Sequence, residues 1–281
     1  MSPPSTAQPD SPYLESHKFT TIPQARKIID AQIDRLTTGT SRAQYLSFTP
    51  VTQDTLNKID EGRWNGQRTI PKCTRLTYHP ASLEMVVKLL PLPSLECVHH
   101  LLEFQILLQT REKGEKLWPT GGATYKKSNG ESREGDASYQ PFARAGRGWP
   151  SMVVEVGLRE NVERVRRDAV WWFRGDEGEG GVSVVLVVIL DVEERKMVVE
   201  MWERTPTVEG RRVTRRVTRS IARGAVKTQE VSAAKDGVDE GELVVGFEKV
   251  VGRRECNGEV ERGIVISAGE VKEWAEIVFP E

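Results

Sequence analysis

The feature of this chain that most constrains its fold is the stretch 182–190, which is almost wholly apolar and rich in β-branched residues. Branching at Cβ favours extended backbone. A strand that is apolar on both faces has to be covered on both faces, which is typical of the centre of a sheet flanked by helices. The stretch therefore predicts an α/β protein with a mixed sheet, and residues 197–202 are predicted to pair with it antiparallel.

Composition excludes several classes of protein. With 38% hydrophobic and 29% charged residues among 281, the chain is expected to fold around a modest core. A net charge of −1 excludes a basic footprint spread over the whole protein, so any affinity for nucleic acid has to come from local patches. The sequence lacks the run of about 20 apolar residues that crosses a membrane, and its first residues lack the features of a secretory signal. Three scattered cysteines favour a reducing compartment, so we expect an intracellular protein, nuclear or cytoplasmic and not secreted.

The rest of the chain divides into a short tail and one predicted domain. Residues 1–18 are rich in Pro and Ser and are predicted to be a disordered tail, followed by a single α/β domain at 19–281. Helical spacing of apolar residues predicts helices at 22–38, 52–59, 95–110, 160–174 and 269–278. Ser94 is the expected N-cap of the third of these helices. Further strands are predicted at 74–78, 83–89, 123–125, 133–139, 151–158 and 242–251.

Two acidic residues stand out within the predicted strands. Glu155 interrupts the apolar run 151–158, and Asp136 lies in the short strand 133–139. An isolated buried charge costs many kcal/mol, so each carboxylate has to be neutralised, paired or bound to a metal. Oxygen ligands of this kind suit Mg²⁺. The alternative is that Asp136 caps a turn while Glu155 pairs with an arginine.

Residues 95–190 follow the order helix, three strands, helix, strand, with Asp136 in the second strand and Glu155 in the third. The phrases that carry a resemblance are GDASYQP at 135–141, WPSMVVEVG at 149–157, RDAVWW at 167–172 and LLPLPSLE at 89–96. In this order and at this spacing they resemble the PD-(D/E)XK, or restriction-endonuclease-like, nuclease superfamily. The closer likeness is to uncharacterised fungal members. The resemblance covers about residues 85–205 and implies an αβββαβ core with added strands.

The resemblance also implies chemistry. Asp136 and Glu155 would hold Mg²⁺, with Mn²⁺ as a substitute, and Glu96 in the first core helix would assist. Catalytic relatives carry a lysine two residues after the Glu, whereas this chain has Gly157 there. Loss of one such electrostatic group costs on the order of 10²–10³ in rate. Replacement candidates are Lys126 or Lys127 on the preceding strand and, as phosphate clamps, Arg166 or Arg167 on the following helix.

Two functions follow from the resemblance. The first is a metal-dependent nuclease-like protein that hydrolyses phosphodiester bonds in nucleic acid, with weakened or lost activity. The alternative is a catalytically inactive nuclease-fold module that binds or interacts. The chain offers no GxSxG, P-loop or HExxH motif that would point to a different reaction.

Three further patterns are candidate binding sites. Glu96, His99, His100 and Glu103 share one side of the helix 95–110. A di-metal cage needs a second helix with the same set, so a polar helix face is predicted instead. At helical spacing one of the adjacent tryptophans 171 and 172 has to face the core, so packing is expected for Trp172. The basic run 211–227 is compatible with phosphate binding, a nuclear-import address or an exposed loop. Its candidate nucleic-acid-binding residues are Arg211, Arg212, Arg215 and Arg216.

Overall fold

The computed structural model describes residues 14–67, 69–146, 148–174, 181–204, 224–236, 241–252 and 263–279. The sequence predicts one domain from residue 19 onward, whereas backbone contacts group the chain into two compact units, Met1–Pro91 and Leu92–Glu281. Among the described residues, no helix is long and apolar enough to cross a membrane.

The first unit is a small α/β unit. In chain order its elements are β1 (Leu14–Lys18), α1 (Ile22–Thr37), β2 (Tyr45–Thr49), α2 (Gln53–Trp64), β3 (Thr74–His79) and β4 (Glu84–Leu89). Within it the strands lie in the order β1-β2-β4-β3, with β1 parallel to β2 and the other pairs antiparallel. The helix at 22–38 and the hairpin at 74–89 are confirmed.

Strand β1 corrects the boundary of the predicted tail. The polar sequence places residues 14–18 in that tail, yet they pair in register with β2 from Leu14 opposite Tyr45 to Lys18 opposite Thr49. An edge strand needs only one buried side, and backbone pairing with β2 supplies the hydrogen bonds that the polar sequence does not reveal. The remainder of the tail lies outside the described residues.

The second unit is built on a mixed sheet. Its strands are β5 (Leu117–Pro119), β8 (Ala137–Pro141), β9 (Met152–Leu158), β10 (Val184–Asp191), β11 (Lys196–Arg204) and β12 (Ala225–Ala234). They lie in the order β12-β11-β10-β9-β8-β5, with β9 and β10 parallel and the other pairs antiparallel. Every residue of β10 is buried, as the apolar run predicts, and its antiparallel partner β11 is confirmed.

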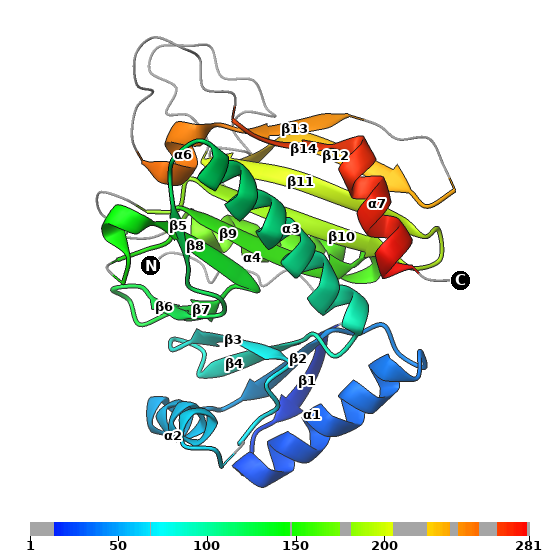
Figure 1. Ribbon diagram of the computed structural model, residues 1–281. Helices are drawn as coiled ribbons and strands as arrows, with labels where there is room; N and C mark the ends of the chain where they lie inside the picture. The colour runs from blue at the N-terminus through cyan, green and yellow to red at the C-terminus, as the bar shows by residue number, and fades with distance from the viewer. Residues whose placement is uncertain are drawn as a thin grey trace, which may run out of the picture. The chain divides into compact units, whose positions relative to one another are not determined.

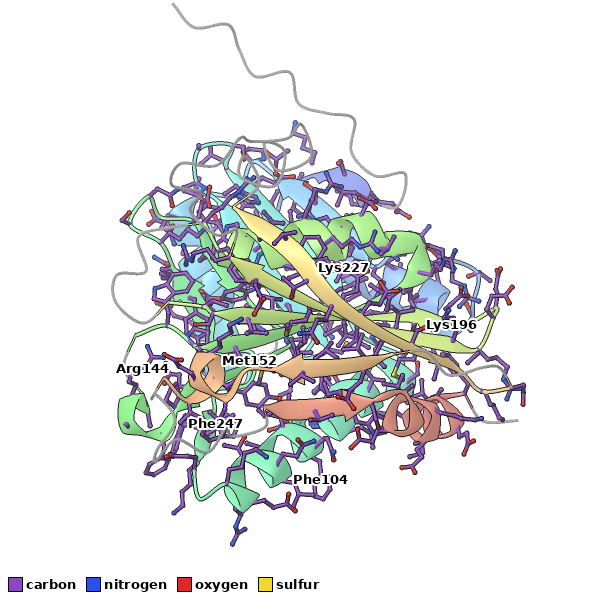
Figure 2. The ribbon with its side chains drawn as sticks, turned by 90° about the horizontal axis from the view of Figure 1, so that it is seen from above. Phe104, Arg144, Met152, Lys196, Lys227 and Phe247 are labelled. Atoms are coloured by element: carbon purple, nitrogen blue, oxygen red, sulfur yellow. The ribbon has the colours of Figure 1, made fainter. Side chains whose placement is uncertain are left out.

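Helices flank this sheet on both faces. The longer ones are α3 (Pro93–Glu112), α4 (Val162–Trp172) and α7 (Ala268–Val278). Figure 2 shows α4 on one side of the strands, and α3 and α7 on the other. Helix α4 forms the crossover from β9 to β10 and buries Val165, Ala169 and Trp172, which recur at helical spacing. The protein is thus an α/β protein with mixed sheets flanked by helices (Figure 1).

Smaller elements complete the second unit. They are the hairpin β6 (Thr124–Lys126) and β7 (Ser132–Glu134), the pair β13 (Glu242–Val245) and β14 (Ile264–Ser267), the short helix α6 (Phe247–Val251), and 3₁₀ turns η1 (Phe142–Arg144) and η2 (Arg159–Asn161). Five described strands, β5 to β9, therefore lie between α3 and α4, where the sequence predicts three.

Three local predictions need correction. Leu92, not Ser94, is the N-cap residue of α3, because Pro93 occupies the first helical turn, where its missing N–H costs nothing. The predicted strand 242–251 ends at Val245 and continues as α6. The predicted strand 133–139 is interrupted, since β7 ends at Glu134 and β8 begins at Ala137.

Candidate functional site

Asp136 lies in the break between β7 and β8. Its carboxylate, in place of a backbone carbonyl, accepts a hydrogen bond from an N–H group of the neighbouring strand β9. Its backbone N–H donates to Val154 O at 3.2 Å, and its Oδ2 accepts from the Val156 N–H at 2.6 Å. The residue is only 1% exposed. A buried carboxylate that accepts a backbone N–H is held in one orientation, along the edge of β9.

Gly135 permits the break to lie close to α4. A Cβ at this position would stand 2.9 Å from Val153 Cγ1 and 3.3 Å from Trp172 Cζ2. Both contacts are tighter than ordinary packing distances, so a side chain here would displace the indole or the strand. The glycine before Asp136 therefore has a steric role in bringing this acid against β9.

Glu155 lies on β9 and is also 1% exposed. Its Oε1 accepts a hydrogen bond from Trp172 Nε1, at the end of α4, at 2.8 Å. The Val156 N–H belongs to the peptide bond between Glu155 and Val156. The Asp136 carboxylate therefore binds the backbone immediately after Glu155. The structure thus brings the two predicted acids to one place in the sheet.

A cluster of aromatic rings surrounds the Trp172 side chain. Its centroid lies 5.1 Å from that of Trp171, 5.7 Å from Tyr125 and 6.1 Å from Trp149, and each of these pairs is edge-to-face. Edge-to-face packing is a favoured geometry for aromatic pairs. Trp172 is fully buried, which confirms its predicted packing role, and its indole N–H also holds Glu155.

Of the two candidate lysines, Lys127 lies nearer to this cluster. Its Nζ donates to Trp171 O at 2.9 Å and lies 3.9 Å from the Trp171 ring centroid, with Glu131 Oε2 at 4.0 Å. An ammonium group at the carbonyl end of a helix interacts favourably with the helix dipole. Lys126, one residue earlier on β6, is exposed.

The candidate arginines of α4 have different surroundings. Arg166 binds Glu200 of β11 through two hydrogen bonds, Nε to Oε2 at 3.1 Å and an Nη to Oε1 at 2.5 Å. Arg167 is exposed. Neighbouring Asp168 is buried and pairs with Arg133 of β7 at 2.7 Å and with Arg164 at 3.4 Å. The four candidate arginines of the run 211–227 lie outside the described residues.

Glu200 is a buried acid that the sequence patterns did not single out. Trp202 Nε1 donates to its Oε2 at 2.9 Å, and Lys227 Nζ lies 3.4 Å from its Oε1. Burial alone would raise the pKa of Glu200, but hydrogen bonds from Arg166 and Trp202 and the charges of Arg166 and Lys227 lower it below its ordinary value. Glu200 interrupts an apolar run just as Glu155 does, so the same pattern could have identified it.

Glu155 and Glu200 occupy one row of the sheet. Val187 of β10 is the partner of Glu155 in the parallel ladder and of Glu200 in the antiparallel ladder. Residues directly opposite in a ladder point to the same face. Both acids therefore face α4, where Glu155 meets Trp172 and Glu200 meets Arg166.

Glu96 belongs to a different face. It lies on α3, which covers the side of the sheet opposite α4 (Figure 2). Its Oε2 is 3.7 Å from His99 Nε2. The structure therefore brings Asp136 and Glu155 together and places Glu96 with the histidines of its own helix.

The donor set at Asp136 and Glu155 fits a hard divalent cation. A carboxylate has two oxygens, so a hydrogen bond at one of them does not exhaust its capacity to ligate. Mg²⁺ prefers oxygen ligands, keeps several waters and needs only one or two carboxylates. Asp136 and Glu155 supply two such carboxylates, each oriented by a hydrogen bond from an N–H group.

Comparison with known proteins adds little. No protein-family model matches the sequence, and no curated protein matches it. Among solved structures, the chain is similar to a crystal structure described as a "putative nuclease belonging to DUF820" from Anabaena variabilis ATCC 29413. That match has a TM-score of 0.42 and 11% identity, and covers 71% of this chain and 90% of the other. At this level of similarity the site has to be argued from its own residues.

Proposed function

We propose that this chain is a nuclease-like protein that binds a divalent cation at Asp136 and Glu155 and acts on the phosphodiester backbone of nucleic acid at a weakened rate. One observation carries the proposal. Asp136, in the break before β8, and Glu155, on β9, are both buried beside the Glu155–Val156 peptide, and each accepts a hydrogen bond. Acids brought together in this way are a typical arrangement for binding a metal ion.

The residues of the site have separate tasks in this proposal. The Asp136 and Glu155 carboxylates would hold Mg²⁺, and the Val156 N–H and the Trp172 indole would fix their orientation. When bound, the cation would supply positive charge to a scissile phosphate and lower the pKa of a bound water. Lys127, whose side chain is 5% exposed and donates to Trp171 O, would contribute a positive charge near the Trp171–Trp172 end of α4.

The slow rate follows from position 157. Side chains two residues apart on a strand point to the same face, so the Gly157 position shares the face of Glu155 but offers no amine. Loss of one electrostatic group at a reacting phosphate costs on the order of 10²–10³ in rate. Glu155 is also only 1% exposed, so contact with a polymeric substrate would require the surrounding side chains to move.

A cleavage assay tests the proposal. Purified protein is incubated with plasmid and with single-stranded DNA in Mg²⁺ or Mn²⁺, alongside Asp136→Asn and Glu155→Gln. We expect slow cleavage that requires the cation and falls to background in both variants. The control is Glu163→Gln, an exposed acid of α4. Cleavage that is unchanged in Asp136→Asn would contradict the proposal.

A gain-of-function variant sharpens the same test. Gly157→Lys would place an amine on the face of Glu155, and Gly157→Ala controls for the steric effect of any side chain there. We expect Gly157→Lys to raise the cleavage rate by on the order of 10²-fold over Gly157→Ala. Equal rates in the two variants, both folded by circular dichroism, would show that the missing amine does not limit the reaction.

One specific observation favours a second function, a catalytically silent binding module. Asp136 and Glu155 are each 1% exposed, and the Trp172 indole is hydrogen-bonded to Glu155. In that case the acids would stabilise the sheet and the chain would bind nucleic acid without cutting it. Retention of DNA in a mobility-shift assay, with no cleavage in wild type or in Gly157→Lys, would favour this module.

A further inference from the structure

Three metal-ligating side chains meet on helix α3, on the face of the sheet opposite the acid pair. One oxygen of Glu96 and one ring nitrogen each of His99 and His100 all lie within 4.8 Å of one another. Positions three and four residues apart are neighbours on a helix surface, so Glu96 faces both histidines. The sequence predicts a polar helix face here because a di-metal cage would need a second helix, but a site for a single ion does not.

The cluster combines a fixed part with an adjustable part. The His99 side chain is 7% exposed, so the packing around it sets its position, whereas the side chains of Glu96 and His100 are 41% and 66% exposed. The two imidazole centroids are 4.2 Å apart. Small rotamer changes of the two exposed side chains would bring the ligand atoms to about 3.4 Å from one another, the spacing of a tetrahedral site with bonds of about 2.1 Å.

Glu103 supports this arrangement from the next turn of the helix. Its Oε2 lies 3.6 Å from His100 Nδ1. A carboxylate beside one nitrogen of an imidazole fixes the ring orientation and makes the other nitrogen a better ligand, an arrangement common at metal-bound histidines. The sequence Glu-x-x-His-His-x-x-Glu at 96–103 thus supplies three ligands and one orienting carboxylate.

A buried hydroxyl lies on the same side of the sheet. Tyr139 of β8 is fully buried, and among the described residues its hydroxyl has no hydrogen-bond partner. Burial, and secondly the negative charge of Glu103, raise the pKa of Tyr139.

We propose that Glu96, His99 and His100 form a mononuclear site for a borderline transition-metal ion of the Zn²⁺ class, with Glu103 orienting His100. Imidazole nitrogens suit Zn²⁺, Co²⁺, Ni²⁺ and Cu²⁺, whereas Mg²⁺ prefers a set of oxygens. The ligand chemistry therefore separates this site from the one at Asp136 and Glu155. The inference is independent of the proposed nuclease-like function, because it concerns different residues and a different class of metal.

Metal titration of the full chain tests the site. Metal-free protein kept under reducing conditions is titrated with Zn²⁺ by calorimetry and with Co²⁺ by visible absorption, in the presence of excess Mg²⁺. We expect one equivalent of each metal to bind, with Co²⁺ bands typical of nitrogen and oxygen ligands. His100→Ala should abolish binding, and Glu103→Gln should weaken it by about tenfold or more.

Three further variants keep the test falsifiable. His99 is buried and its loss could disturb the fold, so the second ligand variant is Glu96→Gln, at an exposed position. We expect Glu96→Gln to weaken metal binding by more than Glu103→Gln does. His79→Ala, a histidine of β3 in the first unit, and Cys97→Ser, a thiol on α3, should leave binding unchanged. Absence of Zn²⁺ uptake, uptake unchanged in both His100→Ala and Glu96→Gln, or uptake lost in Cys97→Ser would each overturn the inference.

Discussion

Glu155 and Glu200 show how one row of a sheet can bury two acids in different ways. Both are 1% exposed, both lie opposite Val187, and both face α4. The guanidinium of Arg166 and the ammonium of Lys227 bind Glu200. Glu155 accepts one hydrogen bond from the uncharged indole of Trp172. The role of each acid therefore depends less on its place in the sheet than on the residue that α4 presents to it.

The difference has a consequence for function. The Glu200 charge is offset by side chains of the protein itself, which makes this a structural site. The Val156 amide and the Trp172 indole donate hydrogen bonds to Asp136 and Glu155, and these bonds orient the two carboxylates. In the proposed function, the two oriented carboxylates also bind a divalent cation.

The largest expected effect is on stability, at Glu200. Glu200→Ala should lower the free energy of unfolding by about 3–5 kcal/mol, because it leaves Arg166 facing a buried site without its carboxylate. Glu163→Ala is the matched control, since Glu163 also contacts Arg166 but its side chain is 76% exposed; its loss should cost about 0–1 kcal/mol. Urea denaturation measures both. Similar losses in the two variants would contradict the structural role of Glu200.

Trp172 should show an intermediate effect. Trp172→Phe keeps an aromatic ring but removes the N–H that Glu155 accepts, and should cost about 1–3 kcal/mol of unfolding free energy. Trp171→Phe is the matched control, because its indole donates to the less buried Glu131, and its loss should cost about 0.5–1.5 kcal/mol. Urea denaturation measures both losses. A smaller loss of unfolding free energy in Trp172→Phe than in Trp171→Phe would contradict a stabilising role for the Trp172–Glu155 hydrogen bond.

The smallest expected effect is a pH dependence that belongs to Glu200. Its folded-state pKa is lowered from the ordinary value of 4.5, so its contribution to stability is present above that value and is lost as pH falls through the lower, folded-state pKa. The stability difference between wild type and Glu200→Gln should therefore be constant near neutral pH and narrow below pH 4.5. Urea denaturation at a series of pH values measures it. A difference that widens on acidification would contradict the assignment.

The sequence predicted the parts of the fold that carry long, regular patterns. The apolar run that becomes β10, the amphipathic helix α4 and the acid inside β9 are local patterns, and the structure confirms those elements. Strands β1 and β12 were missed because they are short or polar, and pairing with β2 and β11 defines them. A pattern within one segment cannot reveal an edge strand whose hydrogen bonds come from elsewhere.

The candidate site was predictable only in part. An acid within an apolar run identified Glu155, and an acid within the short predicted strand 133–139 identified Asp136. Their hydrogen-bond donors were not predictable, because Trp172 comes from 17 residues further along the chain and the Val156 amide from 20 residues beyond Asp136. The same limit applies to Glu200, whose partner Arg166 lies 34 residues away in sequence. Long-range pairing decides which side chain meets each buried acid, and a pattern within one segment of the sequence does not contain that information.

Calorimetric titration with Mg²⁺ of wild type, Glu155→Gln and Glu200→Gln is the most direct test of the acid pair. We predict one Mg²⁺ bound by wild type and by Glu200→Gln, and none by Glu155→Gln, since only Glu155 belongs to the proposed cation site. Equal Mg²⁺ binding in all three proteins, or no binding in any, would contradict a cation site at Asp136 and Glu155.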